Sequence, residues 1–186
     1  MIVQGNKHNS KLYSIESSSD FIKRLNSEYI VLPQSLPNYS YNPSGICGST
    51  AAAMMLRYMD LYVDDDFVPT NIESGNGIAL INHLETFINH SSHGSSAPQV
   101  AFGISDYLSG KVDYSATYDE VEGYILYGQI ADGKPYVIGT FRHPRYGNHW
   151  MTGYGYSGGW AIVNDGWGNS GVYINPSYTT YNIRLW

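Results

Sequence analysis

This sequence is poor in cysteine, in charge and in long apolar runs, and each shortage excludes a class of protein. Its 186 residues include one cysteine, so no intramolecular disulfide can form. The longest clearly apolar run, residues 51–56, is far too short to span a bilayer. Charged residues make up 14% of the chain, and their net charge is -6. Because neither nucleic acid nor an anionic membrane attracts an acidic protein, we expect neither as a partner.

Glycine and tyrosine take the place of the missing charges, with 20 and 18 residues. The length of the chain suits about one domain with a substantial core. Helical spacing and capping residues predict four helices in the first two thirds, over residues 21–25, 47–59, 77–89 and 117–130. From residue 135 onward the pattern is one of short β segments broken by glycine, so the sequence predicts an α+β fold.

Cys47 stands at the start of one predicted helix, in the turn-forming stretch Pro43-Ser-Gly-Ile-Cys-Gly-Ser-Thr-Ala51. The first turn of a helix carries backbone N–H groups without intrahelical partners and the positive end of the macrodipole. Both favour the thiolate, which is the nucleophilic form of cysteine. Cys47 is therefore a candidate nucleophile, although free cysteines are also common as small buried apolar side chains.

A predicted hairpin near the C-terminus brings a histidine towards an aspartate. The strand-like runs 150–156 and 160–163 are joined by Ser157-Gly-Gly159, a hairpin-turn signal. A turn centred on residue 158 places His149 roughly opposite Asp165, and opposed residues have Cβ atoms ~5 Å apart. This is the geometry of a base held by an orienting acceptor. The alternative is a surface histidine beside an Asp-Gly turn.

The other five histidines are weaker candidates. His143 precedes a proline in a basic loop, which suits the rim of a cleft. His90 and His93 lie in a polar loop with no interleaved carboxylate or cysteine, so we predict no metal site there and no cofactor. His8 lies in the polar N-terminus, and His83 falls between apolar positions of a predicted helix.

The chain order Cys47, His149, Asp165 resembles that of papain-like cysteine peptidases. The similarity extends from about residue 37 to residue 167. It is strongest in His149-Trp-Met-Thr-Gly-Tyr-Gly-Tyr156 followed by Trp160-Ala-Ile-Val-Asn-Asp-Gly-Trp-Gly168. The Cys-Gly-Ser-Thr-Ala segment is similar to bacterial branches of the family, such as streptopain and the double-glycine leader peptidases.

The resemblance implies a fold in which the helix of the nucleophile packs on a C-terminal antiparallel sheet. It implies a peptidase domain over residues 37–186, preceded by an extension, residues 1–36, that could be the remnant of a propeptide. The implied activity is hydrolysis of peptide bonds through a Cys-His-Asp triad and a thioester intermediate. Asp165 takes the place of the family's orienting residue, with Asn164 as the alternative if the turn is shifted by one residue.

The oxyanion donor departs from the family pattern, in which a glutamine stands six residues before the cysteine. Tyr41 occupies that position here and Asn42 follows it. Both side chains can donate a hydrogen bond. We assign Asn42 as the donor and keep Tyr41 as its rival.

The same three residues are compatible with two other functions. One is an amidase or acyl transferase acting on cell-wall peptides or glutamine side chains. The other is a non-catalytic peptide-binding module on the same fold. We expect a peptide or protein substrate and a monomeric chain. Composition and resemblance together suggest a secreted or cell-surface protein of a bacterium.

Overall fold

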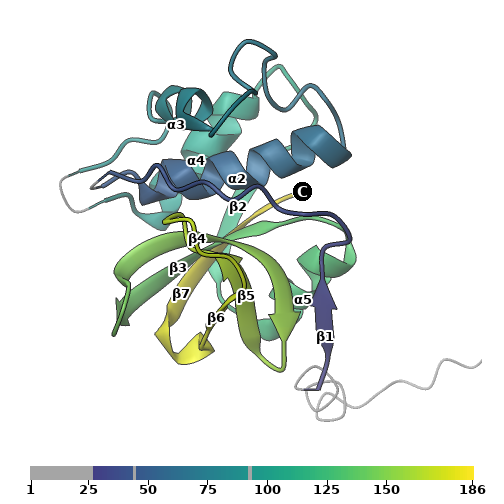
Figure 1. Cartoon of the computed structure of the whole chain (residues 1–186), viewed down its shortest axis with the longest axis vertical. Helices are drawn as coiled ribbons and strands as arrows, with labels where there is room; N and C mark the ends of the chain where they lie inside the picture. The colour runs from purple at the N-terminus through teal and green to yellow at the C-terminus, as the bar shows by residue number, and fades with distance from the viewer. Residues whose placement is uncertain (1–26, 44, 92–93) are drawn as a thin grey trace, which may run out of the picture.

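The computed structural model describes residues 27–43, 45–91 and 94–186. Its helices are α2 (Cys47–Tyr62), α3 (Ile78–Leu84), α4 (Ala97–Leu108) and α5 (Gly123–Ala131), with a 3₁₀ turn η1 (Pro176–Tyr178). Its strands are β1 (Tyr29–Val31), β2 (Ala116–Glu120), β3 (Tyr136–His143), β4 (Gly147–Ser157), β5 (Trp160–Asn164), β6 (Val172–Ile174) and β7 (Thr179–Leu185). In Figure 1, α2, α3 and α4 form a layer above the sheet, while α5 lies next to β1.

All the strand pairs of the sheet are antiparallel, in the order β2-β7-β3-β4-β5-β6. The long strand β4 is at the centre, because β5 pairs along one edge while β3 and then β1 pair along the other. Helices followed by an antiparallel sheet confirm the α+β prediction. The β4–β5 hairpin is also confirmed, with Ser157 opposite Trp160 and Thr152 opposite Asn164.

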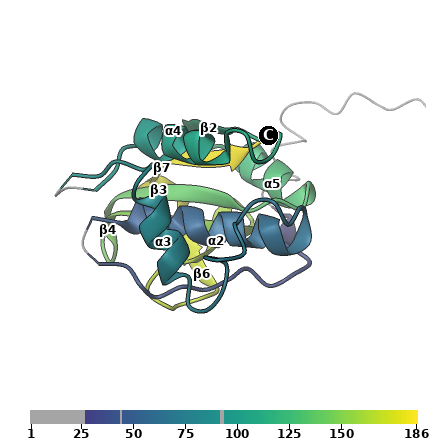
Figure 2. The same cartoon turned by 90° about the horizontal axis from the view of Figure 1, so that it is seen from above.

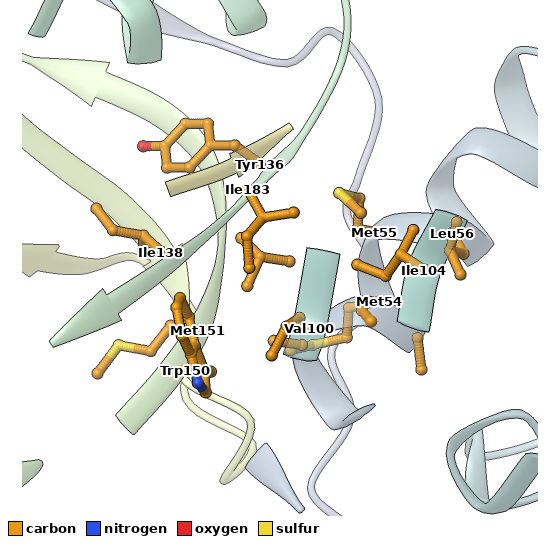
Figure 3. Close-up of a cluster of buried hydrophobic side chains, with 14 of the residues drawn as sticks. Met54, Met55, Leu56, Val100, Ile104, Tyr136, Ile138, Trp150, Met151 and Ile183 are labelled. Carbon is orange, nitrogen blue, oxygen red and sulfur yellow. The ribbon is translucent and has the colours of Figure 1, made fainter. Parts of the chain in front are cut away.

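Helix α2 is buried because small and apolar side chains cover most of its surface. Residues 51–56 are completely inaccessible to solvent, as expected for Ala-Ala-Ala-Met-Met-Leu. Figure 3 shows Met54, Met55 and Leu56 of α2 next to Val100 and Ile104 of α4, facing side chains of the sheet. The Thr152 hydroxyl on β4 donates to the Ala51 carbonyl at 2.8 Å, so a buried hydrogen bond fixes α2 against the sheet.

One helix prediction is wrong over its first residues, and one helix was missed. Residues 116–120 form β2 and not the start of a helix, because they pair with β7 at the far end of the chain. Helix α5 begins only at Gly123. Helix α4 was not predicted at all, although Ser96 and Gln99 form a capping box at its start. Figure 2 shows α4 alongside β2 at one edge of the molecule.

The remaining helix predictions have different outcomes. The helix that starts at Cys47 is confirmed, and the helix expected over 77–89 is shorter, ending at Leu84. The helix expected over 21–25 lies outside the described residues. Strand β1 falls within the expected extension 1–36 yet pairs with β4. The propeptide interpretation of that extension stays a prediction. Within the described part of the chain, no helix combines the length and apolarity needed to cross a membrane.

Candidate active site

Cys47 and His149 line the same surface cavity, which has a volume of about 670 Å³. Cys47 is the first residue of α2, and His149 lies near the start of β4. The hydrogen bond from Thr152 to the Ala51 carbonyl joins β4 to α2, a few residues away from His149 and from Cys47. The fold therefore brings the predicted nucleophile and the predicted base, far apart in sequence, to one cavity.

The His149 ring is held by the main chain of residue 165. Its Nε2 lies 2.7 Å from the Asp165 carbonyl oxygen. A carbonyl oxygen can only accept a hydrogen bond, so Nε2 carries the hydrogen and donates it. Nδ1 is then the ring nitrogen with a free lone pair, able to accept a proton.

The Asp165 carboxylate, which we expected to reach the imidazole, instead closes its own loop. Oδ1 accepts from the backbone N–H groups of Trp167 at 2.9 Å and Asn169 at 3.0 Å. Oδ2 accepts from the Asn169 side-chain amide at 2.7 Å and from the Tyr146 hydroxyl at 3.2 Å. The residue is completely buried. The carboxylate thus shapes the 165–169 loop, and that loop presents the carbonyl to His149.

Two aromatic rings cover the imidazole. Trp167 stacks on His149 with ring centroids 4.3 Å apart, and Tyr146 lies 5.9 Å from His149 with its plane inclined by only 12°. Tyr146 also stacks on Trp167 at 5.4 Å. The plane of the imidazole is therefore fixed by stacking as well as by its hydrogen bond. No local sequence pattern marks Tyr146, because its contacts with residues 165 and 167 are long-range.

Burial favours the neutral forms of both candidate catalytic groups. It raises the pKa of the Cys47 thiol, and the N–H groups of Trp150, Gly48 and Cys47 itself only partly oppose this effect. Burial also lowers the pKa of His149, against the hydrogen bond to Asp165 and the charge of its carboxylate. The sequence predicted a lowered thiol pKa from the helix terminus alone. Desolvation outweighs that contribution here.

The rival residues for these roles lie in other surroundings. Asn164 donates its amide to the carbonyls of Leu36 and Pro37, at 3.3 and 3.0 Å, and so anchors the N-terminal segment. His143 accepts hydrogen bonds from two backbone N–H groups of the 143–146 turn and does not line the cavity with Cys47.

The two oxyanion candidates differ in their hydrogen bonding. The Asn42 Nδ2 atom is buried without a hydrogen-bond partner among the described residues. It packs so tightly against Gly166 that a Cβ added to this glycine would lie 3.0 Å from it. The Tyr41 carbonyl accepts from the Thr50 hydroxyl at 3.0 Å, which ties this segment to α2. Neither Asn42 nor Tyr41 is among the residues that line the cavity of Cys47 and His149, so the choice of oxyanion donor stays a prediction.

Among the described residues, one group of acidic side chains is close enough together to hold a metal ion, and it does not line the cavity. Ligand atoms of Asp64, Asp65 and Asp66 lie within 4.8 Å of one another, but all three residues are exposed. Exposed carboxylates in a loop are ordinary without an ion, and none of them lines the cavity of Cys47.

A helix that begins at a cysteine, packed on an antiparallel sheet that carries a histidine, defines the class of papain-like cysteine peptidases. Residues 31–184 match the model of the Peptidase_C39 like family, and the chain belongs to that family. It is accordingly a cysteine-type peptidase by family. No sequence among the curated proteins matches it.

Three solved structures share this fold at low sequence identity. The peptidase domain of Streptococcus ComA, a bi-functional ABC transporter involved in quorum sensing, has a TM-score of 0.54 at 12% identity, covering 81% of this chain and 98% of that one. A putative C39-like peptidase from Bacillus anthracis has a TM-score of 0.52 at 17% identity, covering 83% of this chain and 96% of that one. Interpain A, a cysteine protease of Prevotella intermedia, has a TM-score of 0.50 at 16% identity, covering 84% of this chain and 94% of that one. The papain-like fold expected from the sequence is confirmed.

Proposed function

We propose that this chain hydrolyses peptide bonds with Cys47 as nucleophile and His149 as general base, through a thioester intermediate. One observation carries the proposal: the two residues line one cavity, and the Nε2 bond to Asp165 leaves Nδ1 as the proton acceptor. A pair without that tautomer could not move a proton from the thiol.

In the first half of the reaction, Cys47 attacks the scissile carbonyl carbon while His149 Nδ1 takes the thiol proton. Burial raises the pKa of the thiol and lowers that of the imidazole, which favours the neutral form of each group before the reaction. The carbonyl oxygen gains the negative charge and is bound by the Cys47 N–H and the Asn42 amide. His149 then gives its proton to the amine as the C–N bond breaks, leaving an acyl group on sulfur.

In the second half, water attacks the thioester while His149 removes one of its protons. The carboxylic acid leaves and the proton returns to the sulfur. Asp165 acts on the imidazole through its carbonyl, while its carboxylate holds the loop. Trp167 and Tyr146 keep the ring in the plane that this proton transfer needs.

The test is digestion of a degenerate peptide mixture, with products read by mass spectrometry, for wild type, Cys47→Ala and His149→Ala. We expect new peptide termini with wild type and none with either variant. Cleavage by Cys47→Ala at the wild-type rate would refute the proposal. Glutaminyl deamidation or cleavage of cell-wall cross-links, with linear peptides left intact, would favour an amidase instead. Saturable peptide binding with no product would indicate a non-catalytic module.

A further inference from the structure

The turn between β3 and β4 carries two exposed arginines, Arg142 and Arg145, that have no carboxylate partner among the described residues. The other arginines of the described ranges, Arg57 and Arg184, bind carboxylates instead. No Asp or Glu stands between residues 132 and 165, so no neighbour in sequence neutralises the turn. The turn is therefore a local concentration of positive charge on a chain whose net charge is -6.

Each of the two guanidinium groups lies over an aromatic ring. The Arg142 Cζ atom is 4.9 Å from the ring centroid of Phe141, and the Arg145 Cζ atom is 5.2 Å from that of Tyr146. The ring face attracts the cation and covers one face of the guanidinium. The N–H groups at the guanidinium edge can then donate in pairs to a carboxylate. Because the side chains are already ordered, less conformational entropy is lost when an anion binds.

The backbone of the turn is held in an uncommon conformation. Arg142 has a φ of 51°, in the left-handed region that favours glycine. Its N–H donates to the Asn148 side-chain oxygen at 3.0 Å. The N–H groups of Arg145 and Tyr146 donate to His143 Nδ1 at 3.2 and 3.3 Å. Such a conformation persists where the surrounding contacts enforce it, and it recurs at ligand sites. The turn thus presents both arginines from a fixed backbone.

This turn begins where the wall of the Cys47 cavity ends. Phe141 and Asn148, one on each side of the turn, line that cavity, and Tyr146 stacks on His149. An extended polypeptide advances ~3.3–3.6 Å per residue, so a substrate bound at Cys47 can pass the turn within a few residues. The net charge of the chain does not prevent the approach of an acidic segment, because salt screens charges more than ~8 Å away.

We propose that Arg142 and Arg145 form an accessory site for acidic side chains of a polypeptide substrate, on the segment that leaves the cavity past the β3–β4 turn. The accessory site binds aspartate and glutamate and repels lysine and arginine. The proposal rests on the proposed function, because it treats Cys47 as the reactive centre.

Labelling of Cys47 measures this recognition without requiring turnover. Peptide reagents carry a chloroacetyl group at the N-terminus or a chloromethyl ketone at the C-terminus, so that the peptide extends to either side of the sulfur. A glycine spacer separates the reactive group from a tail of consecutive Glu, Gln or Lys residues, and mass spectrometry gives the second-order rate of labelling. In one series we expect the Glu tail to react about fivefold faster than the Gln tail at low salt, and the Lys tail to react slowest. These differences should vanish at about 0.5 M salt.

Substitution of each arginine locates the effect. Arg142→Ala and Arg145→Ala should each lower the ratio of the Glu to the Gln rate about twofold, and the double variant should abolish the preference. The Gln rate reports any change in the cavity itself. Lys134→Ala is the matched control, because it removes an equal charge that lies over an aromatic ring, that of Tyr114, and Lys134 does not line the cavity. This control should leave the ratio unchanged.

The outcomes separate the two proposals. Equal rates for all tails in both series would overturn the accessory site, and so would an equal fall of the ratio in Lys134→Ala. A preference for Glu tails that depends on the arginines, without cleavage of any peptide, would overturn the peptidase proposal and leave the accessory site in place. Sedimentation of the wild type, but not of the double variant, with phosphatidylglycerol vesicles, without any preference among the tails, would overturn it in favour of a membrane surface.

Discussion

Replacing Asp165 by asparagine distinguishes two ways in which this residue could hold the imidazole. If its carboxylate bonded the ring directly, an amide that turned its NH₂ group to the ring would favour the wrong tautomer of His149 and cost about 10⁴ in kcat. In this structure the ring bonds the carbonyl of residue 165, which the substitution leaves in place. The negative charge of the Asp165 carboxylate raises the pKa of His149, and the substitution removes that charge. A lower pKa makes His149 a weaker base, so we expect a fall in kcat/KM that is far smaller than about 10⁴.

The larger effect of Asp165→Asn falls on stability. The asparagine oxygen can still accept from the backbone N–H groups of Trp167 and Asn169, but its NH₂ group faces the Asn169 amide, another donor. One hydrogen bond to a charged acceptor is lost and two others weaken, which together cost about 3 kcal/mol. For a chain of this size the melting temperature should then fall by about 6–12 °C.

The assays are kcat/KM on a fluorogenic peptide and calorimetric unfolding. Asn164→Ala is the matched control, because its amide bonds the carbonyls of Leu36 and Pro37 and not the histidine. It should lower the melting temperature and leave kcat/KM unchanged. A loss of about 10³ or more in kcat/KM for Asp165→Asn, with the melting temperature unchanged, would show instead that the carboxylate holds the imidazole directly.

Three further predictions concern the same site. Tyr146→Phe removes the hydrogen bond from the hydroxyl to Asp165 but keeps the ring stacked beside the imidazole. The melting temperature should therefore fall by about 3–6 °C, with less than about tenfold loss of kcat. A loss of about 10³ in kcat would contradict this prediction. Asn42→Ala should cost about 10² in kcat and Tyr41→Phe little, and the reverse order would make tyrosine the oxyanion donor. Since His149 must be neutral to accept a proton, kcat/KM should fall as the pH drops through the pKa of His149, which burial holds below 6.5. The value of kcat/KM should fall again as the pH rises through the pKa of the Cys47 thiol, which burial raises. An acid limb centred above pH 6.5 would contradict this prediction.

Local patterns predicted the parts of the fold that depend on local interactions. The helix at Cys47 follows from a turn and a run of helix formers, and the β4–β5 hairpin from two glycines between strand-like runs. The helix prediction was wrong over residues 117–120 because their capping-box pattern is local, whereas the pairing of this segment with β7 joins residues more than sixty positions apart. Propensity is a weak prior wherever such a pairing decides the structure.

The sequence anticipated that His149 and Asp165 lie close together, and not which of their atoms make contact. The hairpin register brings His149 and Asp165 together, but sequence cannot tell that the bond uses a carbonyl. Four donors from residues 146, 167 and 169 bind the carboxylate of Asp165. The acceptor that remains for the His149 ring is the main-chain carbonyl of Asp165. The prediction of a lowered thiol pKa was wrong for a related reason, because desolvation depends on neighbours that only the folded chain supplies.

During turnover Cys47 should carry the acyl group of the substrate, and acid quenching can trap that intermediate. A peptide ester is mixed with the protein, the reaction is stopped within its first turnovers, and the proteolytic fragment that contains Cys47 is weighed by mass spectrometry. We expect the mass of that fragment to increase by the mass of the acyl group in the wild type, and in neither Cys47→Ala nor His149→Ala at the same time point. Rapid ester hydrolysis with Cys47 unmodified, or an equal rate in Cys47→Ala, would contradict it.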